Sequence, residues 1–328
     1  MTNTDWIHRT KISFVIPCYR SAGTVTAVVE EIVSEMQKNG VERYEIVCVN
    51  DYSPDNVWQV LMALADRYPQ VSAVDLAKNM TRIPAVMAGF AQSDGDVVVV
   101  MDDDGQCPMD RVTALLAPLA GEYDVSIAKY PEKKQSWFKN LGSRVNKRMT
   151  EIMLDKPREL QFSNFLAIRR YVVDEVMKYT NPYPYLTGLL LRTTSRIQNV
   201  EMEERARLAG ATTYTFKKLV ALWMNGFTAF SVKPLRIATA LGCVVAAAGF
   251  LLGLVTVLRK IVDPANILAG YSSTMAVILF VGGVLMLMLG MVGEYVGRIY
   301  ISINKSPQYV VRSVYRGRAA EAKEADER

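Results

Sequence analysis

Three consecutive aspartates, Asp102, Asp103 and Asp104, directly follow the apolar run VVVVM at 97–101. The run is typical of a buried strand, whereas adjacent carboxylates repel one another and favour water or a cation. Alternate residues of an extended segment point the same way, so Asp102 and Asp104 could share a ligand while Asp103 turns aside. Magnesium and manganese bind through one or two carboxylates and substrate phosphates. The pattern predicts a divalent-cation site, with a solvated acidic turn as the alternative.

The other reactive residue types narrow the chemistry. His8 is the one histidine in the chain, so histidine general-base chemistry and His-ligated metals are nearly excluded. The four cysteines have no CxxC spacing, which argues against a zinc site or a disulfide framework. The net charge of +5 suggests an anionic partner, and nucleic acid, lipid headgroups and phosphorylated substrates all fit. The first eleven residues lack the apolar core of a secretory signal.

Apolar runs alternate with helical patterns over the first hundred residues. The runs lack the alternation of a half-exposed strand, which is typical of parallel strands buried on both faces. Strands that alternate with helices predict an α/β fold in which helices cover both faces of a parallel sheet. Such sheets bind ligands outside the carboxyl ends of their strands, which is where the aspartates fall. The expected strands are 11–19, 44–51, 71–77 and 96–101, and the expected helices are 24–40, 56–68 and 82–93.

The region from 109 to 232 is less regular. Residues 123–130 are expected to form a strand, a basic stretch follows it, and residues 161–179 fit a strand followed by a helix. The end of this region, 214–234, mixes aromatic residues with lysines, which suits an interfacial helix on a membrane surface. We therefore place the end of the catalytic domain, 1–213, before this helix.

Two segments, 237–258 and 271–293, carry no charged residue. Each is long enough to cross a hydrocarbon core of about 30 Å, which takes roughly 20 helical residues. The alternative, two buried helices of a soluble domain, is disfavoured because both segments are free of charge on every face. Together they predict a transmembrane hairpin over 235–303.

The distribution of basic residues predicts how the hairpin is oriented. The loop between its helices carries only Arg259 and Lys260, partly offset by Asp263. By the positive-inside rule the flanks lie in the cytoplasm, with the large domain, both termini and a basic tail at 304–328. The flanking basic residues are Lys217, Lys218, Lys233 and Arg236 before the hairpin, and Arg298, Lys305 and Arg312 after it.

An ordered set of motifs resembles a known family over about residues 11–315. "SFVIPCYR", "EIVCVNDYSPD" and "VVVVMDDDGQ" occur in the order found in family 2 glycosyltransferases, which have the GT-A fold, a mostly parallel Rossmann-like sheet. "FLAIRRYVVDEV", "RLAGATTY" and "FTAFSVKPLR" then precede the two apolar segments. This order closely resembles the polyprenyl-phosphate glycosyltransferases, which include dolichol-phosphate mannose synthases and bacterial undecaprenyl-phosphate sugar transferases. A lone D-x-D is a weak signal, whereas the ordered set with its hairpin is a strong one.

The resemblance implies a site for a UDP-sugar and for Mg²⁺ or Mn²⁺. It implies that Asp51 accepts a hydrogen bond from the uracil, and that Asp102 faces the ribose and the metal. It also implies that Asp104 ligates the metal that bridges the diphosphate. Asn50 stands where relatives often have another aspartate. The nucleotide-sugar residues implied in this way are Pro17, Tyr19, Asp51, Asp102, Asp103 and Gln106.

The resemblance also implies cations for the phosphates. Arg207, in R-x-x-G, matches one that approaches them, and Lys129 and Lys133 match looser positions for the acceptor phosphate, with solvated surface lysines as the alternative. Asn164 stands where many relatives have an aspartate considered a catalytic base, and we assign it to the sugar or acceptor phosphate. Asparagine cannot take a proton. However, a phosphate monoester with a second pKa near 6 is already largely dianionic at pH 7. Asp104, Arg207 and Lys129 are the expected catalytic residues.

The expected activity is inverting transfer of a sugar from a UDP-sugar to polyprenyl (undecaprenyl) phosphate, on the cytoplasmic face of the plasma membrane, for cell-envelope glycans. Glucose and N-acetylglucosamine are the first candidates, and galactose or a modified pentose remain open. We expect a lipid bilayer and no nucleic acid as partner, and leave homo-oligomerisation open. A processive polysaccharide synthase is disfavoured as an alternative, because such enzymes usually carry Q-x-x-R-W and more membrane helices, and this sequence shows neither feature. A non-catalytic membrane scaffold is disfavoured by the intact Asp51, Asp102, Asp104 and Arg207.

Overall fold

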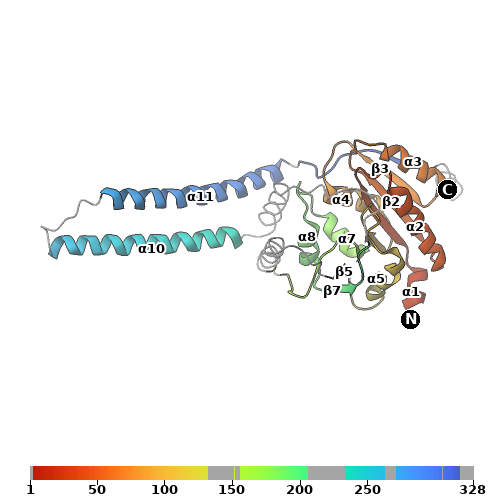
Figure 1. The fold of residues 1–328 in the computed structure, drawn as a ribbon, viewed down its shortest axis with the longest axis horizontal. Coiled ribbons are helices and arrows are strands. Elements are labelled where there is room, and N and C mark those ends of the chain that lie inside the picture. The colour runs from red at the N-terminus through yellow and green to blue at the C-terminus, as the bar shows by residue number, and fades with distance from the viewer. Residues whose placement is uncertain are drawn as a thin grey trace. The chain divides into compact units, whose positions relative to one another are not determined.

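One mixed sheet, with strand order β7-β5-β6-β4-β1-β2-β3-β8, organises the larger part of the chain (Figure 1). The computed structural model describes residues 3–131, 151, 156–205, 233–262, 271–304 and 306–317. The strands are β1 (Ile12–Cys18), β2 (Tyr44–Asn50), β3 (Val71–Leu76), β4 (Val97–Val100), β5 (Val125–Lys129), β6 (Leu166–Arg169), β7 (Ile197–Glu201) and β8 (Val311–Arg316).

The predicted α/β sheet is confirmed, and it is mostly parallel. Strands β4, β1, β2 and β3 pair in parallel, as do β5 and β7. Two strands run against their neighbours: β6 between β4 and β5, and β8 beside β3. The helices of this part are α1 (Asn3–Arg9), α2 (Val25–Lys38), α3 (Val57–Arg67), α4 (Arg82–Gln92), α5 (Val112–Leu116), α7 (Arg170–Met177) and α8 (Leu186–Thr193).

The strand order reverses next to β1. The chain moves outward from β1 through β2 to β3 and then returns to place β4 on the other side of β1. Because such crossovers are right-handed, the return puts α4 on the face opposite α2 and α3 (Figure 1). The carboxyl ends of β1 and β4 therefore flank the switch point, which is where open α/β sheets bind ligands.

Helix α2 shows how the sequence specifies this layer. Its buried side chains recur every three or four residues, so they form one apolar face against the sheet. Strand β1 is buried along its whole length, as expected for a strand covered on both faces. The buried residues of α2 are Val25, Val28, Val29, Ile32, Val33 and Met36.

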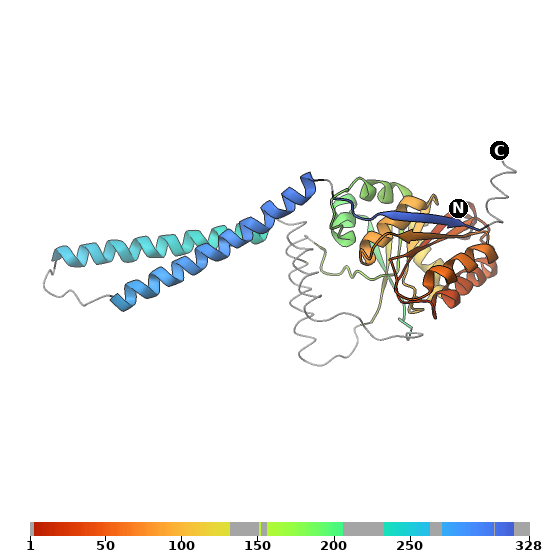
Figure 2. The same cartoon turned by 90° about the horizontal axis from the view of Figure 1, so that it is seen from above.

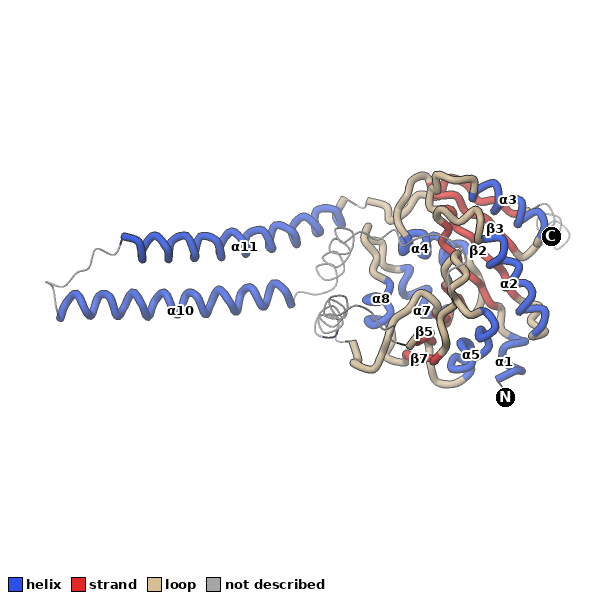
Figure 3. The backbone as a smooth tube through the Cα atoms, viewed as in Figure 1, coloured by secondary structure: helices blue, strands red, loops and turns tan. Residues whose placement is uncertain are grey.

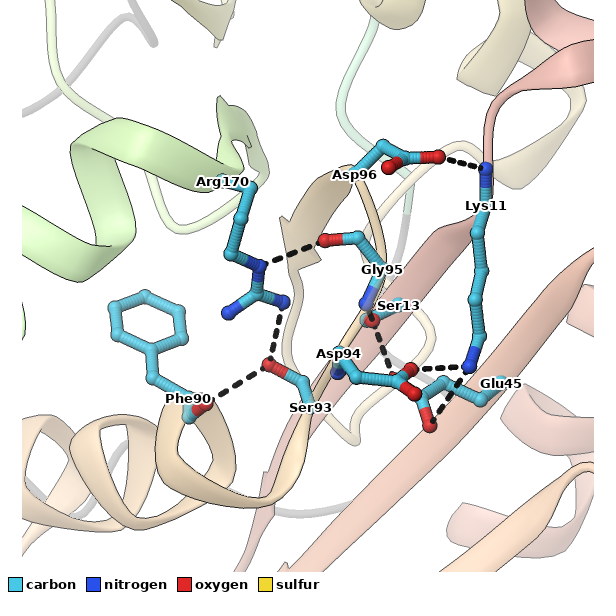
Figure 4. A network of polar contacts seen from close by, with 9 residues as sticks. All are labelled: Lys11, Ser13, Glu45, Phe90, Ser93, Asp94, Gly95, Asp96 and Arg170. Carbon is cyan, nitrogen blue, oxygen red and sulfur yellow. Dashed lines mark hydrogen bonds and ion pairs between the residues drawn. The ribbon is translucent and has the colours of Figure 1, made fainter.

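A polar network fixes the amino end of β4 (Figure 4). The Lys11 amide donates to Asp96 at 2.8 Å, and the Lys11 ammonium pairs with Asp94. The Gly95 amide donates to the Ser13 hydroxyl at 2.8 Å, and Arg170 Nε donates to the Gly95 carbonyl at 2.7 Å. These bonds join the turn before β4 to β1 and α7. By fixing the position of β4 relative to β1, they also fix the position of the aspartates that follow β4.

We predict that Gly95→Ala destabilises the protein. A Cβ at Gly95 would lie 2.4 Å from Ser13 Oγ and 2.7 Å from the Ser13 backbone nitrogen, and backbone cannot move aside cheaply. The free energy of unfolding should fall by about 1–3 kcal/mol in urea titrations, the usual cost of overpacking. Gly23→Ala is the control, because nothing lies within 4 Å of a Cβ there. Equal stability of the two variants would contradict the close approach.

Two long helices belong to a second compact unit, 219–304. They are α10 (Lys233–Val262) and α11 (Tyr271–Ile303), antiparallel neighbours in Figure 3. A Cβ at Gly242 of α10 would lie 2.4 Å from Met288 Cε of α11, so the helices touch there. Within the described residues one helical stretch, Phe280–Ile303, is long and apolar enough to span a membrane. The predicted interfacial helix, 214–234, falls almost entirely outside those residues.

The expectation of a basic tail at 304–328 needs correction. Residues 311–316 form β8, which lies along the sheet edge beside β3 (blue in Figure 2). The larger compact unit accordingly combines 1–218 with 305–328. The segment VVRSVY is rich in β-branched and aromatic residues, which favour strands, and an argument from charge alone overlooks this preference.

Candidate active site

The expected site residues gather where β1, β2 and β4 end. Tyr19 follows β1, Asp51 follows β2, and the three aspartates follow β4. The Tyr19 amide donates to Asp103 Oδ2 at 3.1 Å, which joins the two strands at the switch point. Pro17 lies within β1, one residue before its end. The sheet topology thus brings together residues that are far apart in sequence.

Asp102 is held by two side chains from other elements. Arg82, the first residue of α4, donates from Nε to Oδ1 at 2.7 Å. Asn164, just before β6, donates from Nδ2 to Oδ2 at 2.7 Å. Arg82 also donates to the Asn164 carbonyl at 3.2 Å, which closes a three-residue ring. Each carboxylate oxygen of Asp102 therefore accepts a side-chain donor, and the guanidinium offsets its charge.

The other two aspartates have different partners. Asp103 accepts the Tyr19 amide, and burial raises its pKa to about 6. Asp104 accepts the Gln106 amide through Oδ1 at 3.1 Å. The three adjacent carboxylates thus bond to different partners, and the charge of Asp102 is offset by the Arg82 guanidinium. This arrangement lets three aspartates stand in sequence at the end of a buried strand.

The donor set fits a hard divalent cation. No group of three His, Cys, Asp or Glu ligands occurs in the parts of the chain that the structure describes. Mg²⁺ and Mn²⁺ sites in enzymes that bind nucleotides need only one or two carboxylates, because substrate phosphates and water complete the coordination. The Asp102 and Asp104 carboxylates provide the required oxygen chemistry. They are the residues that would hold such a metal.

Asp51 is 3% exposed and anchors the turn before α4. Its Oδ1 accepts the Met80 amide at 2.7 Å, and its Oδ2 accepts the Asn79 side-chain amide at 3.1 Å. Burial raises the pKa of Asp51 to about 6. Since Arg82 follows this turn, Asp51 also determines where the partner of Asp102 stands. A carboxylate has about four lone-pair sites, and donors from Asn79, Met80 and Thr81 take three of them, so one remains for a further donor.

Strained backbone marks the same edge. Three non-glycine residues of the described chain have positive φ: Arg20 (59°), Tyr52 (50°) and Thr81 (72°). They follow β1, β2 and β3. Thr81, with ψ of 171°, lies in a region that is essentially restricted to glycine. Such strain tends to cluster at functional sites, where the surrounding structure maintains it.

The remaining expected residues lie around this edge or outside the described chain. Tyr19 is 40% exposed, with the Arg20 guanidinium 5.5 Å from its ring centre. The Gln106 side chain donates to Glu204 at 3.1 Å, and Lys129 pairs with Glu201 at 2.9 Å. Lys133 and Arg207 lie outside the described residues, so their predicted roles stay predictions.

A cavity of about 650 Å³ lies beyond Gln106. The Arg205 amide donates to the Gln106 carbonyl at 3.2 Å, and Arg205 pairs with Glu31 at 2.5 Å and with Asp110. Charges of both signs therefore line the cavity, and its cations are partly compensated. The charged lining residues are Asp110, Arg111, Lys129, Glu201, Glu203 and Arg205.

Sequence reasoning missed Arg82 and Asn79. Both lie in the segment between β3 and α4, at the carboxyl edge where ligands were expected. That position was the available signal, because the segment joins the third strand to the helix on the opposite face.

Comparison with known proteins identifies the chain. Residues 13–177 match the model of glycosyl transferase family 2, and residues 233–299 match that of the GtrB C-terminal hairpin. The chain belongs to glycosyl transferase family 2 and is a glycosyltransferase. Within the family it resembles the polyprenyl-phosphate glycosyltransferases.

Similar curated proteins extend over nearly the whole chain. A prophage bactoprenol glucosyl transferase homolog of Escherichia coli is 30% identical over 93% of this chain and 99% of its own. An undecaprenyl-phosphate 4-deoxy-4-formamido-L-arabinose transferase of Proteus mirabilis is 29% identical over 93% and 94%. An uncharacterised glycosyltransferase of Bacillus subtilis is 30% identical over 92% and 94%.

A solved structure supports the GT-A fold. Glucosyl-3-phosphoglycerate synthase from Mycobacterium tuberculosis, in complex with Mn²⁺, UDP-glucose and phosphoglyceric acid, superposes with a TM-score of 0.51. The match covers 67% of this chain and 80% of that one at 17% identity. At this identity the likeness concerns the fold alone.

We predict that Thr81→Gly stabilises the protein. Glycine adopts the Thr81 conformation freely, so about 1–3 kcal/mol of strain is relieved. The greater freedom of glycine in the unfolded chain offsets about 0.5–1 kcal/mol of this. The free energy of unfolding should rise by about 1 kcal/mol in urea titrations. Thr81→Ala keeps a Cβ and is the control. If alanine stabilises as much as glycine, backbone strain is not the cause.

Proposed function

We propose that the protein transfers a sugar from a UDP-sugar to undecaprenyl phosphate at the cytoplasmic face of the plasma membrane. The observation that carries this proposal is the aspartate cluster at the switch point of a family 2 sheet, in a chain that continues into the matching hairpin. Relatives whose names specify undecaprenyl-phosphate and bactoprenol transferases align over nearly their full length. Both observations support a lipid phosphate as acceptor.

The donor side is assigned to the edge formed by β1, β2 and β4. Asp51 and the residues beside it would take the uracil, and Asp102 and Asp104 the ribose and metal. The solved structure that shares the fold holds UDP-glucose and Mn²⁺, which supports a UDP-sugar and a divalent metal here. When bound, the metal would supply positive charge to the departing diphosphate. Arg82 and Asn164 fix the Asp102 carboxylate at the end of β4.

The acceptor brings its own negative charge to the reaction. An oxygen of the lipid phosphate attacks the anomeric carbon, a new C–O bond forms with inversion, and the bond to UDP breaks with its electron pair on the β-phosphate. No protein base is required, because the phosphate is already largely dianionic at pH 7. This fits Asn164, which donates to Asp102 and cannot accept a proton. Lys129, Lys133 and Arg207 are the cations proposed to gather the phosphates.

The membrane assignment rests on the hairpin. Both helices expose large apolar side chains, among them Phe250 and Met286, which are 72% and 74% exposed. Exposed apolar surface on this scale marks an interaction site, and hydrocarbon is the partner that suits two helices of this composition. The basic flanks support an orientation with both termini in the cytoplasm, where UDP-sugars are available. Homo-oligomerisation is compatible with this arrangement.

The direct test uses purified full-length protein with undecaprenyl phosphate, Mg²⁺ or Mn²⁺ and a panel of UDP-sugars. We expect one donor, with glucose and N-acetylglucosamine as first candidates, to give a glycolipid of the matching mass. Asp104→Asn should lower turnover by on the order of 10²-fold or more, as removal of a preorganised electrostatic group does. Excess EDTA should have a similar effect. Full turnover in EDTA would disprove the metal assignment, and the absence of product with every UDP-sugar of the panel would disprove the proposed transfer.

Donor binding should weaken as pH falls through about 6. Asp51 must be ionised to accept from the uracil, and burial has raised its pKa to about 6. Calorimetric titration of the UDP-sugar donor between pH 5 and 8 measures this, because a diphosphate esterified at both ends has no secondary ionisation there. Asp51→Asn should bind weakly and with less pH dependence. Asp103 has a similar pKa and remains in that variant. The pH dependence of donor binding that persists in Asp51→Asn therefore measures the contribution of Asp103.

The same shift affects stability with a defined sign. A carboxyl group whose pKa is higher in the folded state takes up protons on folding, so stability falls as pH rises from about 4 to 6. Asp51→Asn should lose this contribution, whereas Asp174→Asn, at an exposed position of α7, should retain it. If Asp51→Asn leaves both pH profiles unchanged, the assigned role of Asp51 is wrong.

A further inference from the structure

The strand that returns from the hairpin reaches the proposed donor pocket. Strand β8 pairs antiparallel with β3, and its register is irregular at one point. Asp75 pairs with Ser313 and Leu76 with Val311, so Arg312 is an extra residue between them. Such bulges bend a strand and redirect a side chain, often beside an active site. Here the bulge occurs at the carboxyl end of β3, on the ligand-binding edge.

Arg312 contacts three groups on that edge. Its Nη1 lies 3.3 Å from Asp75 Oδ2, and its Nη2 donates to the Ala77 carbonyl at 3.3 Å. Its guanidinium also lies over the Tyr52 ring, 5.4 Å from the centre. One cation therefore joins the end of β3 to the residue that follows Asp51.

Asp75 makes this cation necessary. Its side chain is 6% exposed, and its Oδ1 accepts the Asn50 side-chain amide at 2.7 Å. The Asn50 side-chain oxygen in turn accepts the Ser53 amide at 3.0 Å. Arg312 is the charged partner of Asp75 in the described structure. Without it, a buried carboxylate would retain a neutral amide as its side-chain donor, and breaking such a pair is costly.

The turn 50–53 is consequently held from three directions. Asn50 is bonded to Asp75, Asp51 to Asn79 and Met80, and Tyr52 lies beneath Arg312. Tyr52 is 50% exposed and has a φ of 50°, so its ring is presented from strained backbone. A half-exposed aromatic ring beside a buried carboxylate offers a stacking surface and a hydrogen-bond acceptor. These are the two features that recognise a pyrimidine base.

We propose that β8 completes the base pocket and that Arg312 is a positioning residue for donor binding. The inference rests on the proposed function, because it takes the Asp51–Tyr52 turn as the site of the uracil. Arg312 acts through Asp75 and Tyr52 and stands apart from the reacting atoms. Its loss should therefore weaken nucleotide binding and leave the rate of the chemical step nearly unchanged.

The test measures calorimetric binding of UDP, with Mn²⁺ at pH 7.5, to the full-length protein. UDP is the probe because it is common to every candidate donor. Arg312→Met should raise the Kd by about tenfold, the equivalent of losing one charge-assisted hydrogen bond. In turnover assays the donor KM should rise similarly while kcat stays within about twofold, since the lost interaction is not specific to the transition state. Arg316→Met, the same substitution on the same strand, is the matched control and should bind UDP as the wild type does.

A second variant keeps the test decisive if Arg312→Met does not fold. Arg312→Lys retains a positive charge beside Asp75 but lacks the planar fork, so we expect a Kd raised by about threefold. Wild-type binding by every folded Arg312 variant, with binding lost in Asp51→Asn, would overturn this inference and leave the proposed function standing. If Asp51→Asn also binds UDP normally, the base pocket itself is misplaced and the donor assignment fails with it.

Discussion

The arrangement of this site depends on electrostatic repulsion among three adjacent carboxylates at the end of a buried strand. Asp102 is opposed by Arg82 and held by Asn164, Asp103 turns to the Tyr19 amide, and Asp104 turns to the Gln106 amide. The partners of Asp102 and Asp103 come from other elements, so this arrangement of charges requires α4, the end of β1 and the segment before β6 to be in place. The same groups that make the fold tolerate these charges also set the direction in which the charges point.

Anchoring continues beyond the aspartates. Asp51 holds the turn that begins α4, and that turn carries Arg82 to Asp102. The pocket assigned to the base and the pocket assigned to the metal are therefore linked through one short segment, which includes the strained Thr81. Because both pockets depend on this segment, a substitution in the pocket assigned to the base should also affect the pocket assigned to the metal. Additivity fails for residues that share such a network.

Much of the fold follows from local sequence, and the finer structure of the site does not. Continuous apolar runs locate β1 to β4 within one or two residues, and the 3.6-residue period identifies the buried face of α2. The partners of Asp102 lie 20 and 62 residues away, so no local pattern could assign them. Strand β8 escaped prediction because the basic residues of 304–328, which include Arg312 and Arg316, suggested a tail. Its pairing with β3 is a tertiary choice that propensity alone does not determine.

The position of β8 in the chain also has a consequence for biosynthesis. Arg312 bonds to Ala77, 235 residues earlier, and the whole hairpin lies between them. At about 5–20 residues per second, a ribosome takes on the order of tens of seconds to cover that interval. During this time the edge of β3 has no strand beside it, and open edges are where chains associate wrongly. The sheet is thus completed last, after both long helices have been synthesised. The proposed base pocket can therefore be completed only after the part assigned to the membrane has left the ribosome.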